Sequence, residues 1–252
     1  MELLVAGSGA AYPDRPGTAS STYVVTHEGS RLCLDLGQGG FAGIAGRVEP
    51  STLGAVVISH LHPDHFIDLV ALRHYLRYEF EPPRRVRVMA PAGLTDRLDL
   101  LLAEPGFAAE ALDVEGRREG SIRVGPFTIE SRLVTHTEES YAVRVSIADK
   151  PAAPGLVYSG DCGRADDLAP LIRPGDTLLV EIAFGAGPVP VGDLHLAGPG
   201  VGALAAATGP GRVLLTHLQM RRDPAAAIGA VRAAYVGEIK LVSDGERFQI
   251  TG

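Results

Sequence analysis

The chain has 252 residues, of which 46% are hydrophobic and 21% are charged, a composition typical of a folded globular protein rather than a disordered one. Its formal net charge of −7 argues against a protein that holds long nucleic acid on a broad basic surface, because phosphate neutralisation needs clustered lysine and arginine. Two cysteines, Cys33 and Cys162, are too few for a disulfide framework and indicate free thiols in a reducing compartment. We expect a cytoplasmic location, since the N-terminus lacks a signal-peptide pattern and no stretch reaches ~18 apolar residues.

The first half of the chain is predicted to be rich in strands. Leucines at helical spacing predict helices over residues 66–78 and 95–102. Apolar, β-branched runs bounded by Gly, Pro and Asp predict strands over residues 2–6, 22–26, 31–35, 55–58, 85–90 and 127–133.

The second half alternates strands with helices. The pattern predicts helices over residues 165–172, 199–208 and 224–235. No linker of Pro, Gly or Ser and no short repeat divides the chain, so we expect one α/β domain over residues 1–252. Strands are predicted over residues 141–147, 156–158, 177–182, 213–216, 239–242 and 247–250.

A run of candidate metal ligands follows the strand predicted at 55–58. His60-Leu61-His62-Pro63-Asp64-His65 places three imidazoles and a carboxylate in one strand-to-helix turn. With 8 His and 30 Asp plus Glu in the chain, a chance H-x-H-x-[DE]-H run has a probability of roughly one in a thousand. A solvated loop in which Asp64 caps the next helix would not need three histidines. The run therefore predicts a metal site.

Three later motifs supply further candidate ligands. His136, Asp161 and His217 each come just past the end of a predicted strand, in the segments V-T-H-T, Y-S-G-D and L-T-H-L. α/β proteins collect functional residues at this edge of a sheet. A site built from His and Asp without Cys is typical of catalytic zinc, which keeps one position for water.

The ordered set of H-x-H-x-D-H, a lone His, S-G-D and a final T-H resembles the metallo-β-lactamase superfamily over nearly the whole chain. The resemblance implies a four-layer αβ/βα sandwich with two divalent ions, zinc or alternatively manganese. It also implies that Asp35, in Leu34-Asp35-Leu36-Gly37, supports the ligand loop without binding metal. The implied ligands are His60, His62 and His136 for one ion, Asp64, His65 and His217 for the other, and Asp161 as the bridge.

Within this superfamily the chain is most similar to ribonuclease Z and the small cyclic-nucleotide phosphodiesterases that resemble it. Segment 136–141 resembles that group's H-x-x-x-S-Y element, and segment 158–161 resembles its Y-S-G-D element. Glu181, followed by segment 195–198, resembles the acidic residue and the later histidine element of the same group. Ribonuclease Z carries a long Gly/Pro-containing arm that grips tRNA, whereas here only about a dozen residues join Ile147 to Tyr158. The missing arm and the acidic charge favour a small phosphodiester.

The implied reaction is hydrolysis by a hydroxide that the two ions share. Asp64 would ligate one ion and orient that hydroxide, His195 would protonate the leaving oxygen, and Glu181 would orient His195. From the residues alone, His195 can also be a surface-loop histidine, and Glu181 can be a structural ion-pair partner. Arg221 and Arg222, just past His217, are candidates for phosphate contact if their loop faces the cleft.

Our leading hypothesis is a phosphodiesterase that acts on a small nucleotide-like diester. The alternatives are hydrolysis of a lactone or thioester by the same metals, tRNA 3′ processing with a partner that supplies the grip, and a metal-holding binding protein without turnover. The intact ligands argue against the last, because loss of Asp64 or Asp161 would mark such a protein. We expect a small phosphate-containing substrate, no membrane and no long nucleic acid. Relatives in this group often form homodimers, although no residue pattern here reports an interface.

Overall fold

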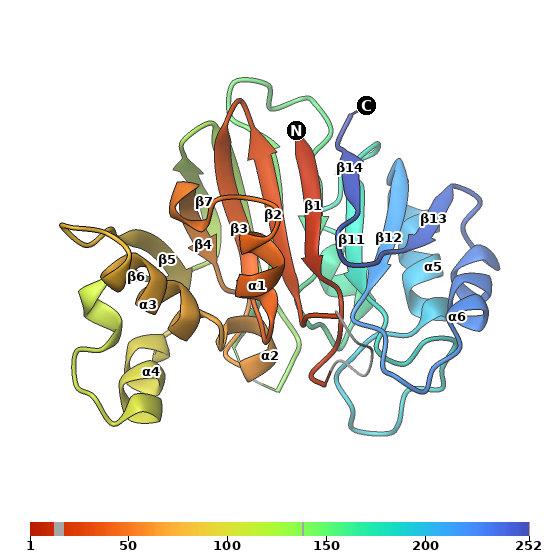
Figure 1. Cartoon of the computed structure of the whole chain (residues 1–252). Coiled ribbons are helices and arrows are strands. Elements are labelled where there is room, and N and C mark those ends of the chain that lie inside the picture. Colours follow the sequence, from red (N-terminus) through yellow and green to blue (C-terminus); the bar gives the residue numbers. More distant parts are fainter. Residues whose placement is uncertain (13–17, 138, 252) are drawn as a thin grey trace.

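The computed structural model describes residues 1–12, 18–137 and 139–251, and its strands form two seven-stranded sheets (Figure 1). The first sheet contains β1 (Glu2–Gly7), β2 (Thr22–His27), β3 (Ser30–Leu36), β4 (Leu53–Val57), β5 (Val86–Ala90), β6 (Leu112–Gly116) and β14 (Arg247–Gln249). The second contains β7 (Gly120–Val124), β8 (Phe127–Val134), β9 (Ser140–Ile147), β10 (Leu156–Tyr158), β11 (Thr177–Glu181), β12 (Arg212–Thr216) and β13 (Glu238–Leu241).

Helices cover the outer face of each sheet. The strand orders are β14-β1-β2-β3-β4-β5-β6 and β13-β12-β11-β10-β9-β8-β7. In Figure 1 the early helices lie beside the first sheet, and α5 and α6 lie beside the second. The helices are α1 (Gly40–Ala45), α2 (Pro63–Phe66), α3 (Leu69–Tyr78), α4 (Leu94–Leu102), α5 (Gly198–Thr208) and α6 (Pro224–Arg232), with 3-10 turns at Pro50–Thr52, Ala108–Glu110 and Ala165–Leu168.

Alternate residues along the strands face opposite sides and build three hydrophobic cores. In β1, Leu3 and Val5 belong to the core between the two sheets, whereas Leu4 belongs to the core beneath α3 and α4. The third core packs the outer face of the second sheet, including Leu215, against α5 and α6. The layers therefore run helix, sheet, sheet, helix, which confirms the predicted four-layer αβ/βα sandwich.

The helix predicted over 165–172 is wrong beyond its first turn. Only Ala165–Leu168 forms a 3-10 turn. Pro170 has no backbone N–H to donate to the carbonyl of Asp166, so an α-helix cannot form across it, although Ala169 itself keeps helical backbone angles. The helix predicted over 66–78 is also divided, because the backbone N–H of Asp68 donates to Leu36 O at 3.1 Å and ends α2.

The sequence pattern missed α1, β6 and β7. In α1, two of the six residues are glycine, which is a poor helix former. β6 and β7 lie at the outer ends of their sheets and are five residues long, and each alternates only two apolar residues with polar ones, which is too short a pattern to predict a strand. Among the described residues, no helix is long and apolar enough to cross a membrane.

Candidate metal centre

The candidate ligands gather where strands of both sheets end. Segment 59–65 follows β4 in the first sheet, and His136, Asp161 and His217 follow β8, β10 and β12 in the second. Figure 1 places α2, which carries Asp64 and His65, at the lower edge of the sheets. The structure thus brings together all the residues that the motifs predicted to meet.

His60, His62, His136 and Asp161 form the first ligand group. His62 Nδ1 lies 2.9 Å from His60 Nε2 and 3.3 Å from His136 Nε2. Asp161 Oδ2 lies 3.7 Å from His60 Nε2. The potential ligand atoms of the group lie within 4.8 Å of one another.

Asp64, His65, Asp161 and His217 form the second ligand group. Asp64 Oδ2 lies 3.2 Å from His217 Nε2 and 3.4 Å from His65 Nε2. Asp161 Oδ1 lies 3.3 Å from His65 Nε2. Asp161 therefore belongs to both groups and directs one oxygen toward each.

Burial and neighbouring charges shift the pKa values of the side chains in the centre. Burial favours the neutral acid of Asp161, but attraction to His217 and His65 outweighs it and holds the pKa of Asp161 well below its usual range. Burial, reinforced by repulsion from His65, lowers the pKa of His60 well below its ordinary value. The carboxylate of Asp161 and the ring of His60 are thus held in the deprotonated and neutral forms that bind a metal ion.

The donor set fits divalent metal ions. Among the described residues, two buried polar atoms that face the centre, His65 Nε2 and Asp161 Oδ1, lack a hydrogen-bond partner. Buried polar atoms normally have partners, so those that face the centre are explained by a ligand such as a cation. Imidazole nitrogens and carboxylate oxygens suit zinc and manganese.

Asp35 holds the ligand loop in place. Its carboxylate accepts hydrogen bonds from Ser59 N at 2.6 Å and from Tyr158 OH at 2.6 Å. His65 Nδ1 lies 2.7 Å from Asp35 Oδ2, which directs Nε2 of that ring into the second ligand group. His65 keeps a raised pKa, because attraction to Asp161 and Asp35 outweighs its burial.

The backbone around the centre is unusually constrained. Asp35 and His217 adopt φ values of 54° and 58°, a left-handed region that non-glycine residues rarely enter. A Cβ on Gly37 would lie 1.8 Å from Asp64 O, so the end of β3 can approach the ligand loop only as glycine. His217 N donates to Ser8 O at 3.0 Å, which ties the final ligand to the loop after β1.

His195 and Glu181 lie at the centre as a pair. His195 Nδ1 is 3.0 Å from Glu181 Oε1 and 3.8 Å from Asp161 Oδ2, and its ring stacks on His217 with centroids 5.7 Å apart. Burial lowers the pKa of His195, but the hydrogen bond to Glu181 and its charge raise it to about 9 overall. Glu181 is buried and also accepts from Cys162 N at 3.1 Å. His195 is therefore not an isolated surface histidine.

Sequence reasoning missed several contacts of this centre. His136 Nδ1 lies 2.9 Å from Leu194 O, which orients the ring. Tyr158 was only part of a motif, yet its hydroxyl reaches Asp35. Glu181, His195 and His217 also form a third group of potential ligands. Glu138, within the predicted 136–141 element, lies outside the described residues.

A model of the β-lactamase superfamily domain matches residues 37–218, which span the ligand run and the final histidine. The chain belongs to the metallo-β-lactamase superfamily. This superfamily member is 30% identical over 244 residues to the uncharacterised protein Rv1339 of Mycobacterium tuberculosis, covering 94% of this chain and 87% of that one. It is 24% identical over 252 residues to the probable metallo-hydrolase YhfI of Bacillus subtilis, covering 97% and 98%.

Solved structures of this superfamily share the fold. The crystal structure of the metallo-β-lactamase fold protein YhfI from B. subtilis has a TM-score of 0.86 at 22% identity, covering 98% of this chain and 99% of that one. The short form of human tRNase Z has a TM-score of 0.75 at 21% identity, with full coverage of both chains. A diphosphatase from the PhnP family has a TM-score of 0.74 at 17% identity, covering 99% and 98%. Taken with the superfamily match and the probable metallo-hydrolase relative, the chain is a metallo-β-lactamase-fold hydrolase, and its similarity to ribonuclease Z is confirmed by 24% identity over 286 residues to that of Mycobacterium marinum.

Proposed function

We propose that this hydrolase is a phosphodiesterase with two divalent metal ions that cleaves a small nucleotide-like phosphodiester. Asp161 carries the proposal, because its Oδ2 faces His60 at 3.7 Å while its Oδ1 faces His65 at 3.3 Å. One carboxylate with an oxygen toward each ligand group suits a pair of neighbouring cations. His60, His62 and His136 would hold one ion, and Asp64, His65 and His217 the other, with zinc favoured and manganese as the alternative.

The protein's own residues supply orientation and a proton. When bound, the two ions activate a water molecule at neutral pH and polarise the phosphoryl oxygens. Asp64, held 3.2 Å from His217, would orient the attacking group from the second ligand group. His195 contacts Glu181 through Nδ1, which leaves Nε2 to carry the proton for the leaving oxygen. Glu181 would act as the positioning residue for that ring.

Short connections around the centre favour a small substrate. Only residues 148–155 join β9 to β10, and no helix or strand lies among them. An arm that reaches along tRNA would need a longer insertion, and a formal charge of −7 gives little attraction for a long polyanion. The structural similarity to a diphosphatase also supports a small phosphate-containing substrate.

The direct test is a substrate panel on one preparation loaded with zinc or manganese. We expect turnover of bis(p-nitrophenyl) phosphate and cyclic nucleotides that disappears with a chelator. Faster hydrolysis of acyl-homoserine lactones would replace the proposal with acyl hydrolysis, and cleavage of precursor tRNA would replace it with tRNA processing. Absence of metal-dependent turnover on every member of the panel would contradict an enzymatic role.

Two variants separate metal binding from proton transfer. Asp161→Ala should reduce the bound metal from about two ions to one or none, as measured by plasma mass spectrometry, because both groups lose a ligand. His195→Ala should keep the metal but slow turnover by about 10²–10⁴-fold, the usual contribution of a general acid. His27→Ala is the matched control, because His27 ends β2 and belongs to none of the three ligand groups.

A further inference from the structure

A cavity of about 550 Å³ opens beside the loop that follows His217. Its volume lies within the range of sites for small ligands. One aromatic side chain and two guanidinium groups contribute to its wall, so the cavity combines a stacking surface with positive charge. The lining residues are Tyr12, Gln219, Met220, Arg221 and Arg222.

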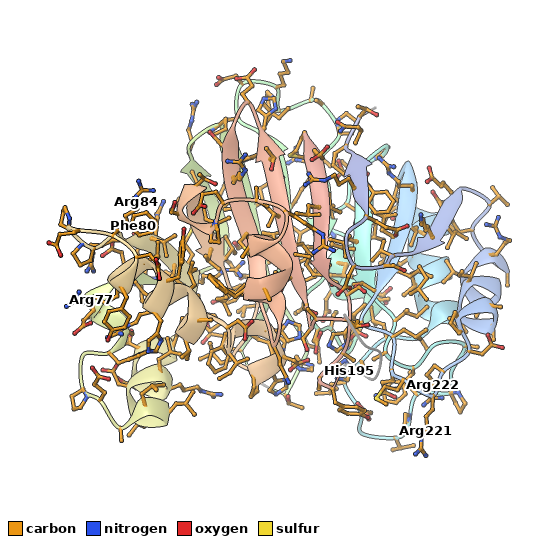
Figure 2. All side chains as sticks on the ribbon, viewed as in Figure 1. Arg77, Phe80, Arg84, His195, Arg221 and Arg222 are labelled. Atoms are coloured by element: carbon orange, nitrogen blue, oxygen red, sulfur yellow. The ribbon has the colours of Figure 1, made fainter. Side chains whose placement is uncertain are left out.

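The cavity adjoins the metal centre on the side of His195. The guanidinium of Arg222 lies 5.1 Å from the ring centre of Phe184, and the Phe184 ring lies 6.1 Å from that of His195. One aromatic ring thus separates Arg222 from the proposed general acid. Figure 2 shows His195, Arg222 and Arg221 at the same lower edge of the molecule.

Tyr12 follows shortly after a segment, Ser8 and Gly9, that hydrogen bonds hold in place. The Asp244 carboxylate accepts hydrogen bonds from Ser8 N at 2.9 Å and from Ala19 N at 2.7 Å. Gly9 forms a bridge with Leu218, the residue after the final ligand. The Tyr12 side chain is 61% exposed, so much of its surface is accessible to a ligand.

The positive charges of Arg221 and Arg222 are available to bind an anionic ligand. In the portion of the chain that the structure describes, neither Arg221 nor Arg222 forms an ion pair, whereas Arg85 and Arg87 each pair with an acid. The neighbouring carboxylate, Asp223, accepts from Ala225 N at 2.8 Å and caps α6. Arg221 is exposed, and its planar guanidinium can bind two phosphate oxygens at once.

We propose that Tyr12, Arg221 and Arg222 form a subsite for the non-reacting part of the substrate, a nucleoside phosphate whose base stacks on Tyr12 and whose phosphate oxygens contact the arginines. The inference rests on the proposed function, because it names the chemistry that the phosphodiesterase selects. Stacking on an aromatic ring accepts any base, so the subsite favours nucleotides as a class rather than one base.

The test is equilibrium binding of adenosine 5′-monophosphate by calorimetry to the full chain, with and without metal. Measurement without metal removes any phosphate contact that depends on the ions. We expect Tyr12→Ala and Arg221→Ala each to weaken binding by about tenfold. Ribose 5-phosphate should bind more weakly than the mononucleotide, because it lacks a base.

The matched controls are Tyr78→Ala, since Tyr78 is 66% exposed, and Arg232→Ala, an exposed arginine on α6. Both should bind the mononucleotide like the wild type. Equal binding by wild type, Tyr12→Ala and Arg221→Ala, or equal affinity for ribose 5-phosphate, would overturn the subsite.

Failure of the proposed function has a separate signature. The wild-type rate on bis(p-nitrophenyl) phosphate tests the phosphodiesterase without involving nucleotide binding. If that rate is absent while Tyr12→Ala and Arg221→Ala still lose mononucleotide affinity, the subsite is supported and the reaction is wrong. If turnover is present but neither substitution changes the affinity for the mononucleotide, the reaction is supported and the subsite is wrong.

Discussion

The hydroxyl of Tyr158 reaches from the second sheet to Asp35 in the first, and through Asp35 it acts on His65. We predict that Tyr158→Phe weakens zinc binding by about 10–100-fold, because the partner that orients a ligand strongly affects metal affinity. The free energy of unfolding of the metal-free protein should fall by only about 1 kcal/mol, the net value of one hydrogen bond. Competition with a chromophoric chelator measures the first quantity and urea unfolding the second. Unchanged zinc affinity would show that Ser59 alone suffices to hold Asp35.

The two thiols should be unreactive in the native protein at mildly alkaline pH. Burial and the nearby charge of Asp35 raise the pKa of the Cys33 thiol well above its ordinary value. Burial also raises the pKa of the Cys162 thiol, to about 12. Only the thiolate attacks a disulfide reagent. We therefore expect no reaction with such a reagent at pH 8 until denaturant is added, when both thiols should react.

The same shifts predict how stability depends on pH. The folded pKa exceeds the unfolded value of about 8.5 for each thiol, so the contribution to stability is complete below that pH and is lost as pH rises above it. A native thiol that reacts rapidly at pH 8 would contradict the burial of at least one of the two cysteines.

At the scale of elements, the contact between the end of β3 and α2 depends on one glycine. A Cβ at position 37 would overlap Asp64 O, so Gly37→Ala must separate the two elements. We expect a loss of about 1–3 kcal/mol in the free energy of unfolding, the usual cost of overpacking, together with reduced metal content. Urea unfolding and metal analysis measure the two effects. Gly116→Ala is the control, because a Cβ there meets nothing within 4 Å.

The ligands were predictable because each one follows a strand and carries a local signature. Residues 60–65 are contiguous, and His136, Asp161 and His217 each close a short apolar run. Most strands were predicted for the same reason, since their buried residues form apolar runs or alternate. The edge strands β6 and β7 show that pattern over only two apolar residues each, because much of both strands faces solvent.

Contacts between distant segments were not predictable. Asp244 accepts from Ser8, 236 residues away, and nothing near either residue in the sequence indicates the other. The same holds for Leu194 O beside His136, since a carbonyl carries no residue-specific signature. Only the folded chain shows that these segments position the ligands, because the pairing arises from tertiary packing rather than from local propensity.

At the scale of the whole molecule, each ligand group combines residues from both sheets. The first group takes His60 from the first sheet's edge and His136 from the second, and the second group likewise pairs His65 with His217. Metal bound there stabilises the native state alone, by about 4 kcal/mol when free metal is 1,000 times the Kd. We predict that chelation lowers the thermal midpoint and that added zinc restores it. A thermal midpoint that changes neither on chelation nor on addition of zinc would contradict metal binding between the two sheets.

The position of the ligands along the chain sets an order for newly synthesised protein. Translation completes His60, His62, His136 and Asp161 before it reaches His217, which lies beyond two further strands, β11 and β12. On the proposed assignment, a growing chain presents a full set of donors for the first ion while the second set still lacks a member. On that assignment the two ions would have different earliest times of arrival, since a ribosome-bound chain that ends before His217 would carry the complete set of donors for the first ion alone.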